Sequence, residues 1–250
     1  MKRRDFLKTS AAAAAVVAVS PLKARAESKK PTVQKYEEIG KTGLKMSDIS
    51  FGTGGLPSAS MVLRAVDRGI NYFDTAPDYG SAEDYIGEAM GKLQRDKIII
   101  ASKFCDYTSY PGHLPLGTPK KKYIESVEES LARMKTDYMD FCFVHAIGEQ
   151  SKEKDREVKR LLDEEMLSAV ADLKKAGKVR FLAVSSHGPS NMEDLLMEAV
   201  RSGHYDMFMP SFNFMNFPRL PEVMKEAGKR GVGVVAMKTL AGAKDTDFDP

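Results

Sequence analysis

Residues 118–145, TPKKKYIESVEESLARMKTDYMDFCFVH, contain one complete helix–strand unit of the kind that decides the fold. Thr118 is a residue type favoured at a helix N-cap, and Pro119 follows it where proline is favoured, at the first helical position. Met139–His145 is a mostly apolar run with two phenylalanines, which predicts a buried strand. An amphipathic helix leading directly into a buried strand is typical of βαβ units and a parallel sheet.

Similar runs recur along the chain, with amphipathic segments between them. The predicted strands are Ile49–Gly52, Tyr72–Thr75, Lys97–Ser102, Met139–His145, Val179–Ser185, Met207–Phe212 and Val232–Met237. Ser190 marks the start of a helix over 191–201. Glycines typical of helix C-terminal caps separate helical segments from the strands that follow, at Gly69, Gly177, Gly203 and Gly231.

Two α/β architectures have this alternation. A doubly wound sheet carries a glycine-rich sequence between its first strand and helix, but Gly52–Gly55 has no third glycine in the required register. A (β/α)8 TIM barrel has roughly 250 residues and gathers its polar functional residues at the carboxyl ends of its strands. We therefore predict a TIM barrel that lacks its eighth strand and helix in this chain. We expect those elements to belong to a longer gene product, truncated here at Pro250.

The first 26 residues are predicted to be an export signal. A basic start that includes Arg3 and Arg4 precedes the apolar run Ala11–Val19 and a small-x-small cleavage sequence at 24–26. The arginine pair resembles a twin-arginine signal, so we expect the twin-arginine translocation machinery as a partner and a periplasmic location. The apolar run is about half the ~20 residues that span a bilayer, so we expect no permanent membrane anchor. A disordered basic tail on a cytoplasmic enzyme is the alternative.

The positive charge of the chain is concentrated in this signal. Of 38 basic and 35 acidic residues, six and one lie in residues 1–26, so the remainder holds 32 and 34, a net charge of −2. That balance does not predict a nucleic-acid-binding face. Residues 27–35 are polar and predicted to be a linker, which leaves 36–250 for the barrel. Cys105 and Cys142 lie in no ligand-spaced cluster, and we expect no disulfide.

Polar side chains lie at the ends of three consecutive predicted strands: Asp74 with Tyr79 in the turn after it, then Lys103, then His145. Carbonyl reduction by hydride transfer needs a proton donor, and a tyrosine can serve if its pKa of about 10 is brought nearer to neutrality. A neighbouring ammonium favours the phenolate, and a paired carboxylate keeps that ammonium charged. We therefore predict Tyr79 as the general acid, supported by Lys103 and Asp74. His145 would donate a hydrogen bond to the carbonyl oxygen.

Each of these residues also has an ordinary structural explanation. A strand-end aspartate often caps a helix, a strand-end lysine is commonly solvated, and a histidine after an apolar strand is often a satisfied core residue. The functional interpretation depends on all four occurring together in roles that need one another. A metal-dependent hydrolase using Asp74, His145 and His187 is a further alternative. It leaves Tyr79 and Lys103 without a role, so we expect no metal site.

These motifs resemble those of the aldo-keto reductase family. GINYFDTAPDYGSAEDYIGEAM, residues 69–90, resembles its Asp-to-Tyr signature, and IIIASKF and FVHA resemble its lysine and histidine motifs. YEEIGKTGLKMSDISFGTGGL, residues 36–56, is similar to the hairpin that closes the barrel floor in that family. LAVSSHG and VVAMKTLAGA are similar to bacterial members that often carry a ferredoxin-like iron–sulfur domain, although this sequence has no such cysteine cluster. The resemblance extends over roughly residues 36–243.

The resemblance implies NADP(H) as the cofactor, with NAD as the alternative, and a small-molecule aldehyde or ketone as the substrate. The cofactor-binding positions that it implies are Gly52, Thr53, Asp74, Ser185, Ser186, Met209, Met237, Lys238 and Leu240. Ser186 and Met209 stand where the family has Asn and Gln, and Met237 stands where it has an aromatic residue. Lys238 would meet the pyrophosphate or remain a solvated cation.

The resemblance implies that the adenosine 2′-phosphate binds after the eighth strand, which we expect this chain to lack. The preference for NADPH over NADH therefore rests on the resemblance alone. The charged segment Gly148–Arg160 is expected either to border the substrate pocket or to be solvated surface. The departures at Ser186, Met209 and Met237 leave a second functional hypothesis open. In that hypothesis the protein is non-catalytic and at most binds nucleotide.

Overall fold

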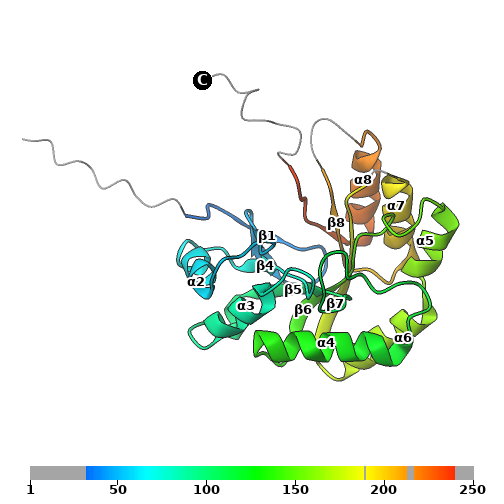
Figure 1. Ribbon diagram of the computed structural model, residues 1–250. Helices are drawn as coiled ribbons and strands as arrows, with labels where there is room; N and C mark the ends of the chain where they lie inside the picture. The colour runs from blue at the N-terminus through cyan, green and yellow to red at the C-terminus, as the bar shows by residue number, and fades with distance from the viewer. Residues whose placement is uncertain (1–31, 189, 213–216, 240–250) are drawn as a thin grey trace, which may run out of the picture. The chain divides into compact units, whose positions relative to one another are not determined.

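Seven parallel strands alternate with helices (Figure 1) in the computed structural model, which describes residues 32–188, 190–212 and 217–239. The strands of this sheet are β3 (Phe51–Gly52), β4 (Tyr72–Asp74), β5 (Ile99–Lys103), β6 (Met139–Val144), β7 (Val179–Ser186), β8 (Met207–Pro210) and β9 (Gly233–Val234). The helices are α2 (Ala59–Asp67), α3 (Ala82–Met90), the 3-10 helix η1 (Arg95–Lys97), α4 (Lys120–Met134), α5 (Lys154–Leu161), α6 (Glu164–Lys175), α7 (Met192–Ser202) and α8 (Leu220–Arg230).

The sheet order confirms the predicted fold class. All seven predicted strands are present, and their ends differ from the prediction by no more than three residues. Each strand pairs in parallel with the next one along the chain, from β3 to β9, without the change of direction that a doubly wound sheet has. The sheet is therefore an open part of a TIM barrel.

The two faces of the sheet bury different cores because successive strand residues point to opposite sides. Phe73 and Ile100 belong to the larger cluster, in which the sheet packs against the surrounding helices. Tyr72, Ile99 and Phe141 belong to a second cluster on the other face. Four helices cover part of the first face as a continuous layer, since α2 packs on α3, α3 on α4, and α4 on α6. Strands buried on both faces explain the continuous apolar runs in the sequence.

An antiparallel hairpin, β1 (Tyr36–Glu38) and β2 (Lys45–Ser47), lies at the amino ends of the strands. It contacts the start of β9 through a hydrogen bond from Lys41 N to Gly231 O of 2.8 Å. A Cβ at Gly40 would lie 2.3 Å from the same oxygen, so only glycine permits this approach. The hairpin predicted to close the barrel floor is confirmed.

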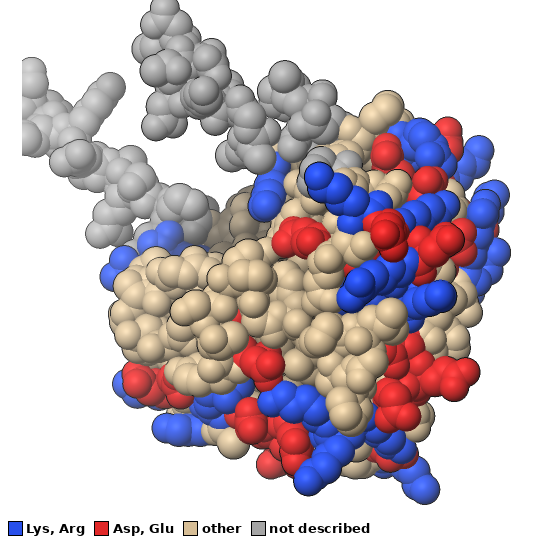
Figure 2. Space-filling view, turned by 45° about the vertical axis from the view of Figure 1, so that its right-hand side comes forward, with Lys and Arg blue, Asp and Glu red and all other residues tan. Residues whose placement is uncertain are grey.

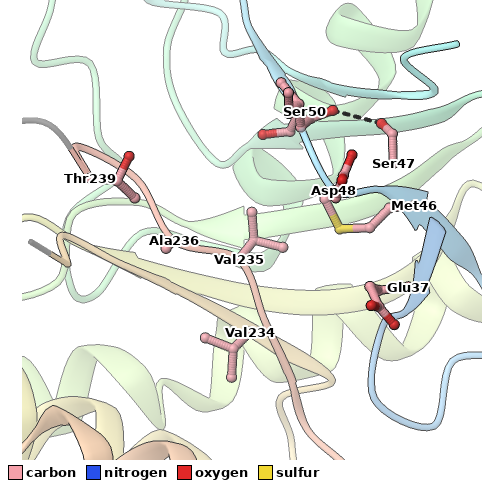
Figure 3. A pocket seen from close by; sticks show the side chains of 10 residues that line it. Glu37, Met46, Ser47, Asp48, Ser50, Val234, Val235, Ala236 and Thr239 are labelled. Carbon is pink, nitrogen blue, oxygen red and sulfur yellow. Dashed lines mark hydrogen bonds between the residues drawn. The ribbon is translucent and has the colours of Figure 1, made fainter. Parts of the chain in front are cut away.

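The sheet has two edges, β3 and β9, which do not pair with one another in the described residues. Between them lies a groove of about 470 Å³, shown in Figure 3. Its lining comes from the hairpin, the segment before β3 and the segment from β9 onward, with Met46 and Val235 among the side chains. None of the four predicted catalytic residues borders this groove.

Helix ends agree less well with the sequence prediction than strands do. Helix α4 begins at Lys120 with Pro119 at its N-cap, and the Thr118 hydroxyl donates to Pro115 O at 2.7 Å instead of capping the helix. The N-cap of α7 is Asn191, in the left-handed conformation, and not Ser190. The predicted C-terminal glycines are confirmed, because Gly203 and Gly231 adopt positive φ at the ends of α7 and α8.

The outer surface carries both signs of charge. Lysine and arginine side chains alternate with acidic ones over α5, α7 and α8 on the right of Figure 2. Asp194, for example, accepts from Arg219 at 2.9 Å and lies 3.6 Å from Lys154. In the part of the chain that the structure describes, no helix is both long enough and apolar enough to cross a membrane.

Helix α3, which follows the loop bearing Tyr79, depends on a glycine for its packing. A Cβ at Gly87 would lie 2.1 Å from Arg133 O of α4. Gly87→Ala is therefore expected to lower the free energy of unfolding by about 1–3 kcal/mol through overpacking, as measured by urea denaturation. The matched control is Gly91→Ala, at the end of the same helix. Gly91 is right-handed helical and has open space around it, so that variant should stay within about 0.5 kcal/mol of the wild type or gain stability.

Candidate active site

The alternation of strand residues explains why three of the four predicted catalytic side chains meet. Asp74 lies two positions after Tyr72 on β4, and Lys103 lies two positions after Ala101 on β5. Tyr72 and Ala101 both belong to the second core cluster described above. His145 likewise follows Phe143, at the end of β6. Residues two apart in a strand share a face of the sheet. These side chains therefore lie on the same face as the second core cluster, at the carboxyl ends of adjacent strands. The predicted convergence of the strand ends is therefore observed for this part of the tetrad.

Lys103 is the central contact of the site. Its ammonium donates to Asp74 Oδ1 at 2.7 Å and to Thr75 O at 2.8 Å, and its side chain is 2% exposed. Burial by itself would lower the pKa of Lys103, but the Asp74 carboxylate outweighs it and raises that pKa above its usual value. The lysine is therefore held charged in a desolvated position, as the sequence hypothesis requires.

Tyr79 lies in the turn between β4 and α3, where its backbone N–H donates to Ala76 O at 3.1 Å. The Lys103 ammonium is 5.1 Å from the centre of its ring. Burial raises the pKa of Tyr79 to about 12, and the lysine lowers it by a smaller amount. Lys103 lowers the pKa of Tyr79 as expected, but the loss of solvation on burial raises that pKa by more. Tyr79 therefore carries its proton, which is the form that a general acid needs.

His145 is 1% exposed and faces several other groups. Its Nδ1 lies 3.4 Å from Cys105 Sγ, and its ring meets that of Tyr79 edge-on with centroids 6.1 Å apart. Burial is the largest reason that its pKa falls well below the usual value, followed by the charge of Lys103. The imidazole is therefore neutral, and Nε2 is buried without a hydrogen-bond partner among the described residues. A neutral imidazole can donate one hydrogen bond to a substrate oxygen.

The predicted cofactor-binding residues lie around the same strand ends. Thr53 donates to Asp74 O from both its N–H and its hydroxyl, each at 2.9 Å, which ties the end of β3 to β4. Gly52 pairs with Asp74 in the register of these two strands, and Ser185 pairs with Met209 in the register of β7 and β8.

Three of the predicted cofactor-binding positions come after β9 in the chain, and the structure describes two of them. Met237 forms an isolated bridge with Ser211, and Lys238 is exposed with a φ of 53°. Leu240 lies outside the described residues.

The residues of the metal-hydrolase alternative do not assemble as ligands. Asp74 is bound by Lys103, and His187 Nδ1 is bound by Glu149. The rings of His145 and His187 are 6.0 Å apart.

The structure also adds residues that sequence reasoning missed. Glu157 and Arg160 fall in the charged segment expected at the pocket border or on the surface, yet both are almost fully buried. The Arg160 guanidinium donates to the His145 carbonyl oxygen at 2.5 Å, and Glu157 Oε2 accepts from Gly148 N. The pair therefore holds the backbone directly after β6. Its only sequence signal was the spacing of three residues between Glu157 and Arg160, which is common on solvated helices.

The parallel barrel sheet thus holds a buried lysine–aspartate pair, a tyrosine and a histidine near its strand ends. The family model described as the aldo/keto reductase family matches residues 49–248, and the chain belongs to that family. Residues 1–20 match the model of the twin-arginine translocation signal sequence, which implies export.

Individual relatives agree with this assignment. The chain is 29% identical over 225 residues to L-glyceraldehyde 3-phosphate reductase of Escherichia coli (strain K12), covering 83% of this chain and 62% of that protein. It is 28% identical over 227 residues to L-galactose dehydrogenase of Arabidopsis thaliana, covering 85% and 67%. A crystal structure assigned as an aldo-keto reductase from Pseudomonas aeruginosa superposes with a TM-score of 0.70 at 26% identity, covering 87% of this chain and 83% of the other. The chain thus spans 62% of the length of the first relative.

Proposed function

We propose that this protein reduces an aldehyde or ketone to an alcohol with NADPH, and that Tyr79 is the general acid. The observation that carries the proposal is the position of the Lys103 ammonium. It lies 2.7 Å from Asp74 Oδ1 and 5.1 Å from the ring centre of Tyr79. A buried cation this close to a tyrosine stabilises the phenolate that proton donation leaves behind.

The residues around the strand ends fit a nicotinamide nucleotide. Ser185 Oγ accepts from Ala146 N at 3.0 Å, and its hydroxyl proton can donate to a carboxamide. Gly52 is exposed, with open space where a Cβ would be, so a flat ring can approach the backbone. Ser186 fits less well, because its hydroxyl donates to Ile147 O and offers only lone pairs.

The other contacts follow from the chemistry of each side chain. Met209 and the partly buried Met237 would pack against the ring through their thioethers. Lys238 would bind the pyrophosphate as a point charge. NADPH is proposed ahead of NADH because the family resemblance implies it.

When bound, the nucleotide supplies a hydride to the carbonyl carbon. The chain's own residues handle the oxygen. His145 donates a hydrogen bond that orients it, and Tyr79 transfers its hydroxyl proton to it, so that hydride and proton together convert the carbonyl to an alcohol. Lys103 stabilises the resulting phenolate, and Asp74 keeps the lysine charged and in place.

The export signal is part of the proposal. Residues 1–26 would be a twin-arginine signal that the translocation machinery recognises and that is removed after export to the periplasm. Residues 27–35 would link it to the barrel, over residues 36–250. Export of a folded protein would allow it to acquire its nucleotide before leaving the cytoplasm.

The test combines nucleotide binding and turnover on the purified chain. NADPH fluorescence should saturate on titration, and NADPH should be consumed in the presence of a generic aldehyde or ketone, with NADH titrated in parallel. Tight binding without turnover of any carbonyl would contradict the proposal and support the non-catalytic hypothesis. Absence of both would also contradict it for this chain.

A further inference from the structure

Three side chains with metal-binding atoms meet beside Tyr79: Asp78, Cys105 and His145. One ligand atom from each lies within 4.8 Å of the other two, and all three residues are buried. They come from the loop after β4, from a position two residues after the end of β5, and from the end of β6. This is the one such group of three in the described residues, and it differs from the set that the sequence suggested.

Two of these atoms already have the separation that a shared ion requires. Cys105 Sγ is 3.4 Å from His145 Nδ1. A tetrahedral Zn²⁺ with Zn–S of about 2.3 Å and Zn–N of about 2.0–2.1 Å holds its sulfur and nitrogen ligands about 3.5 Å apart. Asp78 offers a carboxylate oxygen as the third ligand atom of the group.

The hydrogen bonding around the cluster is incomplete. Asp78 Oδ2 accepts from Gly112 N at 2.9 Å, but Asp78 Oδ1 is buried without a partner among the described residues. His113 Nε2, 3.9 Å from Asp78 Oδ2, is likewise buried and unpaired. A thiol-to-imidazole hydrogen bond would account for Cys105 and His145, but it leaves the carboxylate oxygen uncompensated, which is costly. A cation would compensate it.

We infer that Asp78, Cys105 and His145 bind a divalent transition-metal ion of the Zn²⁺ class. Thiolate and imidazole donors select such ions over Mg²⁺ and Ca²⁺. Three protein ligands leave a fourth position for water. Coordination replaces the S–H bond of Cys105 with an S–metal bond, and the thiol proton passes to solvent. This assignment does not depend on reductase activity.

The ion would also hold the segment between β5 and α4 against β6. Cys105 and His113 form an antiparallel bridge, and Asp106 N donates to Gly112 O at 2.8 Å, so this segment is a small hairpin with Cys105 at its base. An ion that binds only the folded state stabilises it by RT ln(1 + c/Kd), where c is the ion concentration, so the temperature of unfolding should rise with the logarithm of c once c exceeds Kd.

The experiment is a titration of the full chain with Co²⁺, which reports a thiolate ligand by a charge-transfer band in the near ultraviolet. The wild type should bind one equivalent with that band, Zn²⁺ should displace it, and Mg²⁺ should not. Cys105→Ser should abolish the band. The matched control is Cys142→Ser, because Cys142 is the other buried free cysteine but lies on β6 outside the cluster.

Asp78→Asn keeps the shape and the thiol, and it should weaken Zn²⁺ binding by more than about tenfold, since changes to outer-shell partners alone cost about 10–100-fold. Circular dichroism checks that each variant is folded, and Zn²⁺ should raise the Tm of the wild type and of Cys142→Ser. The inference is overturned if the wild type gives no thiolate band. It is equally overturned if Cys105→Ser keeps the band, or if folded Asp78→Asn binds Zn²⁺ as the wild type does. None of these measurements needs NADPH or a carbonyl, so their failure is distinct from failure of the proposed reduction.

Discussion

Tyr79→Phe is expected to lower kcat/KM for carbonyl reduction by about 10²–10⁴-fold, the usual contribution of a positioned acid. The substitution removes one hydroxyl and keeps the ring, so its contact with His145 and its place above Lys103 should remain. The affinity for NADPH should be unchanged, because the hydroxyl is proposed to act on the substrate oxygen alone. The measurement is steady-state NADPH consumption together with NADPH fluorescence titration.

The matched control is Tyr85→Phe, on α3 six residues further along, where the tyrosine is half-buried. It should retain wild-type turnover. If Tyr79→Phe stays within about tenfold of the wild type, Tyr79 is not the proton donor. Equal loss of activity in both variants would attribute the effect to the β4–α3 region in general and would also contradict the assignment.

The second large effect concerns stability, and it lies at the amino ends of the strands. Asp140 on β6 is 1% exposed and accepts from Ile100 N of β5 at 2.9 Å and from Arg180 of β7 at 2.7 Å. Arg95 donates to the same carboxylate at 2.8 Å. One side chain thus ties three adjacent strands together. Asp140→Ala should lower the free energy of unfolding by about 3 kcal/mol, because it leaves the buried Ile100 N–H without its acceptor and removes the anion that the less buried Arg95 and Arg180 share. Urea denaturation measures the change.

Asp137→Ala is the matched control, since Asp137 is exposed three positions earlier in the chain. That variant should remain within about 0.5 kcal/mol of the wild type. A loss of less than about 1 kcal/mol in Asp140→Ala would mean that the three strands hold their register without the carboxylate. Hydrophobic packing of β5, β6 and β7 would then account for this end of the sheet.

Strands were more predictable than helix ends for a physical reason. A strand buried on both faces is apolar at most of its positions, so its place is visible in the sequence. A helix start has several acceptable capping residues, and packing selects among them. Thr118 and Ser190 were both reasonable caps, but α4 starts after Pro119 and α7 after Asn191.

The predicted active-site geometry was partly visible for the same reason. Asp74, Lys103 and His145 sit at strand ends, and a parallel sheet brings those ends to one side. The state of Tyr79 was not visible, since its pKa depends on how much burial opposes the lysine charge. The burial of Glu157 and Arg160 was also hidden, because charged residues at helical spacing are usually solvated.

The sequence by itself determined the family, the parallel barrel sheet and the strand-end residues, because each depends on local patterns and on the period-two alternation of strands. Only the tertiary structure decided which loop side chains meet. Cys105 lies 40 residues from its partner His145 along the chain. Their contact continues the register of β5 and β6, in which Lys103 pairs with Phe143. The choice of partner strand and of register follows from the packing of the whole sheet, which no local pattern encodes.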